Sequence, residues 1–310
     1  MRLIFFGSGD FGLPTLDHLH AHHDIALVVS QPARPAGRKR VLTPTPIEAY
    51  AADHDLPAFT PDAPNDADAI ARIHDIDAEA FVVIAYGHKL SEALLGDRFA
   101  INLHASLLPK YRGAAPINRA MIANESHTGV SVITLAQRMD AGAVLATSRL
   151  RIDPMETAGE LHDRLAALGP DVVASVLDDF RRDALAPVTQ DETLACPAPK
   201  FTKADGTTDF NDHADRIRAR IHGLTPWPGC TVRLAEQDLK VTRVRVDQVD
   251  GTIAEPGTIL DDGTVACATG SIALLAVTPA GGKSMTFEAY RRGRNIEAGT
   301  LVSPKTITKT

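Results

Sequence analysis

Asn102, His104 and Ser106 occupy alternate positions at the end of an apolar run, Phe99–Leu103, that is typical of a buried strand. Alternate residues of a strand share one face, so these three side chains point the same way. Polar side chains on a buried face cost free energy unless they are hydrogen-bonded. The set therefore either marks a functional site or meets solvent at the end of the strand, and this stretch alone leaves both interpretations open.

Together with Asp140, two of these side chains could catalyse acyl transfer to an amine. Such a transfer needs a donor for the developing oxyanion, and an Asn or a protonated His supplies one, worth about 10²–10³ in rate. His also exchanges protons near neutral pH, which typically contributes about 10²–10⁴. A carboxylate such as Asp140 would orient the His104 imidazole and favour its protonated form. Sequence spacing does not show whether Asp140 reaches His104, and no Ser-His-Asp or Cys-His nucleophile pattern stands out.

Strands and helices that alternate through residue 182 predict an α/β fold: a Rossmann-like, mostly parallel sheet with helices on both faces. We expect strands at 2–6, 25–30, 57–60, 80–85, 99–106, 129–135 and 144–152, and helices at 13–22, 47–54, 66–73, 115–124 and 157–182, the last divided at Gly169-Pro170. The run Ala80–Ala85 is apolar throughout, as in a central parallel strand. It ends at the carboxyl edge, where open α/β sheets bind ligands.

The last third of the chain predicts a smaller OB-like β-barrel. After a polar linker come a helix at 212–222 and short strands at 231–234, 239–246, 257–260, 264–268 and 271–277. We expect a catalytic domain at 1–190, a linker at 191–209 and a β-barrel domain at 210–310.

The sequence Gly7–Gly12, GSGDFG, matches the dinucleotide-binding fingerprint between a strand and a helix. The next strand lacks the terminal acid that would bind a ribose hydroxyl and ends in Ser30-Gln31-Pro32. Arg34 could instead meet a 2′-phosphate, which keeps an NADP-dependent oxidoreductase open. The other interpretation is a tight turn that needs glycine for backbone reasons.

Residues 31–46 carry four prolines and four cations, Arg34, Arg38, Lys39 and Arg40, without an acid. Because proline disfavours regular elements, we predict a long exposed loop. It is either simply solvated or contacts a polyanion, and the four unbalanced cations favour the contact.

Composition narrows the class of protein. The 310 residues carry a net charge of −7, which argues against a protein that coats nucleic acid indiscriminately. No apolar run approaches the roughly 20 residues of a membrane helix. Three widely spaced cysteines suggest neither a zinc site nor a disulfide framework, so a reducing, cytoplasmic compartment is expected.

The segment Asn102–Pro116 is similar to the N-x-H-x-S-L-L-P-x-x-R-G-A-x-P signature of the formyltransferases that use 10-formyltetrahydrofolate. VIAYG at 83–87 and MDAG at 139–142 match this family at corresponding distances, and the resemblance covers essentially the whole chain. Further segments resemble the members that act on methionyl-tRNA: 31–38, 168–170, 190–192, 226–228, 279–283 and the β-domain. Two features depart from the family: GSGDF replaces the usual G-T-P-(D/E)-F, and the C-terminal domain is less basic.

The resemblance implies roles for individual residues. Asn102, His104 and Asp140 match the catalytic trio. The donor 10-formyltetrahydrofolate would be contacted by Ser106, Leu107, Leu108, Pro109, Ile84, Tyr86 and Gly87. The acceptor end of initiator methionyl-tRNA would be contacted by Arg38, Lys39 and Arg40.

The reaction implied is transfer of the formyl group to the α-amino group of methionyl-initiator tRNA, in translation initiation, without a metal and by a monomer. Three alternatives stay open: a formyltransferase acting on an amino-sugar nucleotide or a small amine, the NADP-dependent oxidoreductase, and a nucleic-acid-binding module without turnover.

Overall fold

The computed structural model describes residues 1–37, 40–251 and 254–305, and the chain divides into two compact units. The N-terminal unit comprises residues 1–113, 129–150 and 162–197, and the C-terminal unit comprises the remaining segments. The domain boundaries expected near residues 190 and 210 stay a prediction.

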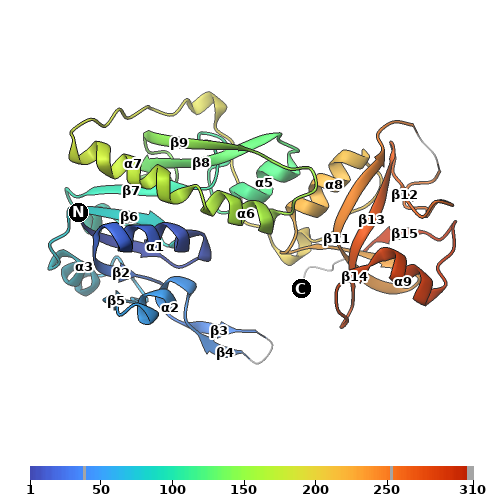
Figure 1. The fold of residues 1–310 in the computed structure, drawn as a ribbon, viewed down its shortest axis with the longest axis horizontal. Helices are drawn as coiled ribbons and strands as arrows, with labels where there is room; N and C mark the ends of the chain where they lie inside the picture. The colour runs from blue at the N-terminus through green and yellow to red at the C-terminus, as the bar shows by residue number, and fades with distance from the viewer. Residues whose placement is uncertain (38–39, 252–253, 306–310) are drawn as a thin grey trace. The chain divides into compact units, whose positions relative to one another are not determined.

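The N-terminal unit contains a seven-stranded sheet in the order β5-β2-β1-β6-β7-β8-β9 (Figure 1). The first five of these strands are parallel to one another, and β8 is antiparallel to β7. The strands are β1 Arg2–Gly7, β2 Asp24–Val29, β5 Ala58–Phe59, β6 Ala80–Ile84, β7 Phe99–His104, β8 His127–Thr134 and β9 Val144–Arg151. The predicted Rossmann-like, mostly parallel sheet is confirmed.

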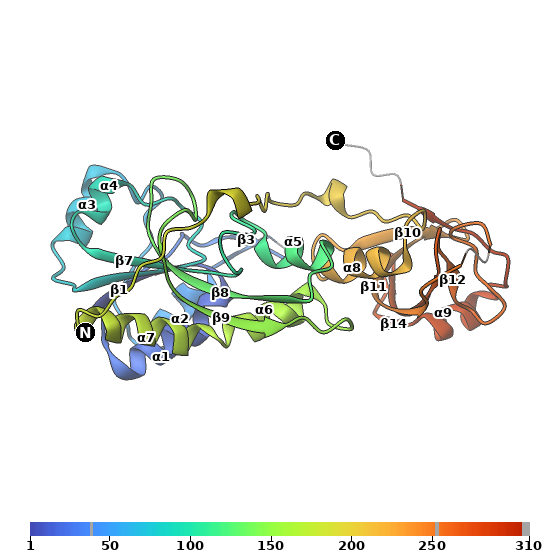
Figure 2. The same cartoon turned by 90° about the horizontal axis from the view of Figure 1, so that it is seen from above.

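Helices cover both faces of this sheet (Figure 2). Helices α1 (Leu13–His22) and α7 (Gly169–Arg181) lie on one face, and α3 (Ala67–His74) and α4 (Glu92–Leu95) lie on the other. Ile4 and Phe6 of β1 pack with residues of α3 and α4. This alternation along β1 follows from the two-residue period of a strand. The other α-helices formed by the described residues are α2 Pro46–Asp53, α5 Pro116–Ile122, α6 Ala158–Ala166, α8 Ala214–Gly223 and α9 Phe287–Arg294.

The C-terminal unit is built on an antiparallel sheet in the order β12-β13-β11-β10-β15, with β14 paired to β13. Its strands are β10 Cys230–Leu234, β11 Gln237–Gln248, β12 Val265–Ala266, β13 Ser271–Pro279, β14 Met285–Thr286 and β15 Val302–Pro304. The sheet curls into a nearly closed barrel around its own apolar core, which confirms the predicted β-barrel. Helix α5 packs on α8 within this unit, where the Asn118 amide donates to the Gly223 carbonyl at 2.7 Å.

Several elements differ from the sequence prediction. Residues 31–46 are not wholly irregular, because β3 (Arg34–Ala36) and β4 (Val41–Thr43) form an antiparallel hairpin with Pro35 opposite Leu42. A two-stranded ribbon tolerates proline, since each strand has one free edge. The strand expected at 257–260 is reduced to isolated bridges, and α4, α9, β14 and β15 were not predicted. These missed elements are short or carry weak periodicity.

Candidate active site

Strand β7 carries Asn102 and His104 to the carboxyl edge of the sheet. Leu103 points toward α7, where a Cβ added to Gly169 would lie 2.9 Å from the Leu103 side chain. Because neighbouring residues of a strand face opposite ways, Asn102 and His104 point to the face that carries α3 and α4. His104 is the last residue of the strand and only 6% exposed, so it does not simply meet solvent.

Both ring nitrogens of His104 have defined neighbours. Nε2 lies 2.9 Å from the Tyr111 carbonyl oxygen, and Nδ1 lies 3.6 Å from Oδ2 of Asp140. A carbonyl only accepts hydrogen bonds, so Nε2 must carry a proton and donate it. Proton exchange is therefore left to Nδ1, the nitrogen that faces the carboxylate.

Asp140 is held by its backbone conformation and by a neighbouring loop. Its φ of 55° lies in the left-handed region, which Asp tolerates better than most residues. The Gly113 N–H donates to Asp140 Oδ2 at 2.9 Å. Gly142 has no room for a side chain, since an added Cβ would overlap the Thr134 carbonyl. Such conformations persist where surrounding structure enforces them, and they concentrate at functional sites.

The β8–β9 loop must fold back to bring Asp140 to His104. Thr134, which ends β8, pairs with Ile101, whereas His104 pairs with Ser131. The loop therefore begins level with Ile101, which lies three positions, or about 10 Å, from His104 along β7. From there it returns over the sheet toward His104. This return places the acid and the imidazole together, which sequence spacing could not show.

Asn102 provides a hydrogen-bond donor with no internal partner. The side chain is half-buried, and within the part of the chain that the structure describes nothing bonds to its amide. A free amide two residues before His104 can donate to an oxygen of a bound molecule.

An apolar cavity of about 470 Å³ lies in the same unit, between the segment around α4 and the start of the β8–β9 loop. Leu90, Leu95 and Leu135 line it, together with polar residues that include Ser91 and Gln137. Cavities of roughly 300–1,000 Å³ lined this way are typical small-molecule sites. Gln137 lies three residues before Asp140, so one loop contributes to both the cavity and the acid.

Sequence reasoning missed most of this lining. Lys89–Leu95 matches no known binding motif, and only its place after the end of β6 points to a ligand. Tyr111 and Gly113, which hold His104 and Asp140 through backbone groups, leave no side-chain signal either.

The residues expected to contact the donor occupy different environments. Ile84 and Tyr86 are buried in the core, at 0% and 2% exposure, and burial raises the pKa of Tyr86 to about 12. Gly87 is exposed and has a φ of 83°. In the Ser106–Pro109 segment, the Ser106 hydroxyl donates to the Lys110 carbonyl at 2.7 Å, and Leu108 is 8% exposed. Leu107 and Pro109 are half-buried.

The glycine-rich turn after β1 is tied to the end of β6. The N–H groups of Ser8 and Gly9 both donate to the Ala85 carbonyl at 3.3 Å. A Cβ on Gly7 would lie 2.6 Å from Phe5. Backbone hydrogen bonds and close packing therefore explain why this turn is rich in glycine. They support the interpretation as a tight turn, which needs no bound dinucleotide.

Comparisons with known proteins identify the family of the chain. Residues 1–177 match the model of the formyl transferase family, and residues 200–295 match that of the formyl transferase C-terminal domain. A methionyl-tRNA formyltransferase from Heliobacterium modesticaldum is 40% identical, over 96% of this chain and 99% of the relative. One from Ruegeria pomeroyi is also 40% identical, over 97% and 99%. The chain belongs to the methionyl-tRNA formyltransferase family.

Solved structures with low sequence identity to this chain share its fold. An N-formyltransferase from Helicobacter canadensis, solved with folinic acid and dTDP-3-aminofucose, gives a TM-score of 0.67 at 12% identity, over 88% of this chain and 98% of the other. HypX from Aquifex aeolicus, solved with tetrahydrofolic acid, gives 0.63 at 13% identity over 94% of this chain, which spans only 47% of that protein.

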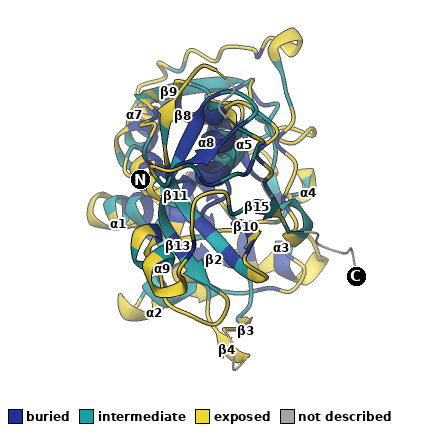
Figure 3. Ribbon diagram, turned by 90° about the vertical axis from the view of Figure 1, so that its right-hand side faces the viewer, coloured by how far each residue is buried: buried dark blue, intermediate teal, exposed yellow. Residues whose placement is uncertain are grey.

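The basic segment of this chain, residues 31–46, contains the exposed hairpin β3–β4 (Figure 3). Arg34 and Arg40 are exposed, and Val41 and Leu42 are 60% and 67% exposed beside them. The predicted tRNA contacts Arg38 and Lys39 lie outside the described residues, so only Arg40 of that set is placed.

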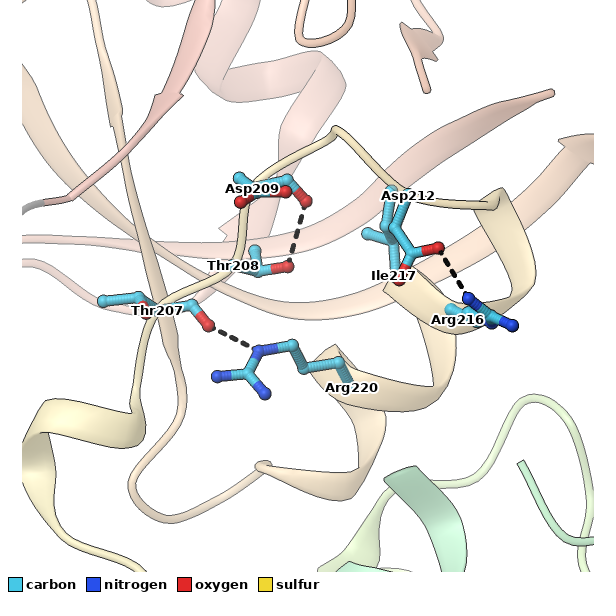
Figure 4. Close-up of a pocket in the computed structure, with 7 residues that line it drawn as sticks. All are labelled: Thr207, Thr208, Asp209, Asp212, Arg216, Ile217 and Arg220. Atoms are coloured by element: carbon cyan, nitrogen blue, oxygen red, sulfur yellow. Dashed lines mark hydrogen bonds and ion pairs between the residues drawn. The ribbon is translucent and has the colours of Figure 1, made fainter. Parts of the chain in front are cut away.

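A second cavity, of about 250 Å³, lies in the C-terminal unit between α8 and the segment before it (Figure 4). Its cations already have partners: Arg220 donates to the Thr207 carbonyl at 2.7 Å, and Arg216 lies 3.3 Å from Asp212. Both cations are thus paired within the cavity wall, and we assign the cavity no role.

Neither a metal centre nor a bilayer-spanning helix is found in the described residues. No three His, Cys, Asp or Glu side chains among them gather as metal ligands. None of the helices they form is both long and apolar enough to span a bilayer.

Proposed function

We propose that the protein transfers the formyl group of 10-formyltetrahydrofolate to the α-amino group of methionine esterified to initiator tRNA, a step of translation initiation. The observation that carries this proposal is 40% identity over nearly the full length to relatives named methionyl-tRNA formyltransferase. The His104–Asp140 pair beside the free amide of Asn102 supplies the chemistry.

The cavity beside the β8–β9 loop is the place for the donor. Leu90, Leu95 and Leu135 form an apolar wall suited to a flat heteroaromatic ring, and Ser91 and Gln137 supply polar groups at its edge. Its volume of about 470 Å³ suits the ring and the adjoining formyl group. The glutamate tail of the donor would extend outside it. Among the residues expected to contact the donor, exposed Gly87 remains available, and Tyr86 packs in the same core cluster as Leu90, Leu95 and Leu135. The Ile84 side chain faces Gly12 instead, on the other side of the sheet.

Asn102, His104 and Asp140 divide the chemistry. The amine nitrogen attacks the formyl carbon, and the Asn102 amide donates to the oxyanion that forms. His104 Nδ1 accepts the proton lost by the amine, while Nε2 stays bonded to the Tyr111 carbonyl. Asp140 stabilises the imidazolium across 3.6 Å.

Collapse of the tetrahedral intermediate completes the transfer. The bond between the formyl carbon and N10 of the folate breaks, and His104 Nδ1 returns its proton to that nitrogen. The products are formylmethionyl-tRNA and tetrahydrofolate. The imidazolium also faces the reacting centre during the step, so it adds to the oxyanion stabilisation expected of His104.

The experiment that tests the function compares two acceptors. The protein is incubated with 10-formyltetrahydrofolate and either methionyl-tRNA or uncharged tRNA plus free methionine, and the formylated product is measured. Formyl transfer to the charged tRNA alone is expected. Transfer to an amino-sugar nucleotide instead would keep the chemistry and overturn the acceptor, and NADPH oxidation without formyl transfer would overturn both.

A further inference from the structure

Gln190 uses all the hydrogen-bonding capacity of its amide to join two loops of the N-terminal unit. Nε2 donates to the carbonyls of Asp140 and Gly142 at 2.8 and 2.7 Å. Oε1 accepts from Nε and Nη2 of Arg112 at 3.0 and 2.7 Å. An amide has two donors and two acceptor positions, so each is occupied here. The residue is 7% exposed, although it lies in a segment whose sequence predicts a domain border.

The two loops joined in this way hold the catalytic pair. The Asp140–Gly142 segment carries the acid, and Arg112 directly precedes Gly113, whose N–H bonds the same carboxylate. Tyr111, on the other side of Arg112, accepts the His104 Nε2–H. Gln190 therefore fixes the acid from one side and the backbone that holds both His104 and Asp140 from the other.

Glu192 extends the arrangement by two ion pairs. Its carboxylate lies 2.9 Å from Arg112 and 3.1 Å from Arg138, and the hydrogen bond from Arg112 lowers the pKa of Glu192. Glu192 is half-exposed, so its pairs are screened by solvent. Gln190 is the buried part of the arrangement and makes the direct bonds to the Asp140 loop.

We propose that Gln190 is a positioning residue for formyl transfer, one that sets the place of the Asp140 carboxylate against His104 without touching either substrate. The proposal rests on the proposed function for its catalytic consequence. The hydrogen bonds themselves do not depend on which acceptor the enzyme uses. No other side chain of similar length donates twice and accepts twice, so neither Glu nor Met can replace it.

Two substitutions separate the donors of Gln190 from its acceptor. Gln190→Glu keeps the acceptor for Arg112 but sets a carboxylate against the two carbonyls. Gln190→Met keeps the approximate shape, introduces no charge and removes all four bonds. Gln248→Glu, on the exposed end of β11, is the matched control for the charge change.

We expect kcat to fall about 10- to 100-fold in both Gln190 variants, because displacing a catalytic group by about 1 Å costs up to 10²-fold. The KM values for donor and tRNA should stay within about twofold, since Gln190 contacts neither. The pH profile of kcat should change even in the uncharged Met variant. Gln248→Glu should match the wild type in all three measurements.

A measurement without substrate distinguishes this proposal from the proposed function. Hydrogen exchange, followed by mass spectrometry, should show faster exchange in the peptide containing Gly113 in both Gln190 variants and no change in the control. If the wild type fails to formylate methionyl-tRNA but the exchange result holds, the proposed function is lost and the positioning arrangement stands. Unchanged exchange at Gly113, normal kcat in the Glu variant, or a kcat loss that disappears at temperatures far below unfolding would each overturn the positioning role.

Discussion

Removing only the charge of Asp140 tests the catalytic arrangement most directly. Asp140→Asn preserves the shape of the side chain and an oxygen that can accept the Gly113 N–H. Asn also tolerates the left-handed backbone at this position, with its φ of 55°, whereas Ala would add strain. A change in turnover in this variant therefore reports on the charge opposite His104 and not on the loop.

The size of the effect follows from the distance between the two groups. Two unit charges 3.6 Å apart at an effective dielectric constant of about 20 interact by at most roughly 4–5 kcal/mol. Asp140 is partly exposed, at 13% of its side chain, so solvent screens part of this interaction. We expect about 10²–10³-fold slower transfer, which corresponds to about 3–4 kcal/mol of lost transition-state stabilisation.

Single-turnover formylation of methionyl-tRNA at saturating donor measures this loss in the chemical step. The control is Asp163→Asn, which removes the charge from a solvent-exposed His–Asp pair of the same unit, where Asp163 lies 3.0 Å from His162. The control should keep wild-type turnover. Turnover above about one-fifth of wild type in Asp140→Asn, or a loss confined to KM, would refute the role of Asp140 in stabilising the imidazolium.

Three further perturbations have defined outcomes. Gly142→Ala should slow transfer and lower the melting temperature in a thermal scan, because its Cβ would overlap the Thr134 carbonyl; unchanged values of both would contradict the close approach. Replacing Arg38, Lys39 and Arg40 together by Gln should weaken tRNA binding and flatten its salt dependence by roughly 0.7–0.9 for each phosphate that these side chains neutralise, so an unchanged slope would exclude phosphate binding by this segment. Burial lowers the pKa of His222 to about 4, and its Nε2 accepts the Val244 N–H as a neutral ring. The C-terminal unit should therefore keep its stability above about pH 6.5 and lose about 3 kcal/mol as pH falls from 6.5 to 4, where only the unfolded chain binds the proton. Urea unfolding followed by Trp227 fluorescence measures this loss, which His222→Gln should reduce.

The sequence predicted those parts of the molecule in which local chemistry and local structure coincide. The period of the apolar residues indicated the parallel sheet, and the carboxyl end of β6 and the polar end of β7 indicated where its site would be. The Gly169-Pro170 break between α6 and α7 was also predicted, because proline is favoured in the first turn of a helix.

Two predictions failed where backbone pairing or side-chain hydrogen bonding overrode the preference indicated by residue type. The hairpin β3–β4 forms despite Pro35, because pairing across the ribbon outweighs the local preference of proline for irregular backbone. The role of Ser106 also differs from the expectation of a shared face, since β7 ends at His104 and the Ser106 hydroxyl closes the following turn.

By itself the sequence determined the fold class and the identity of the side chains that could do the chemistry, since residue type and spacing carry both. Only the tertiary structure decided how these side chains meet. The return of the β8–β9 loop brings Asp140 to His104, and Tyr111, Gly113 and Gln190 fix the pair mainly through backbone carbonyl and N–H groups. Every residue except proline carries both of these groups, so no sequence pattern marks the positions at which they are used.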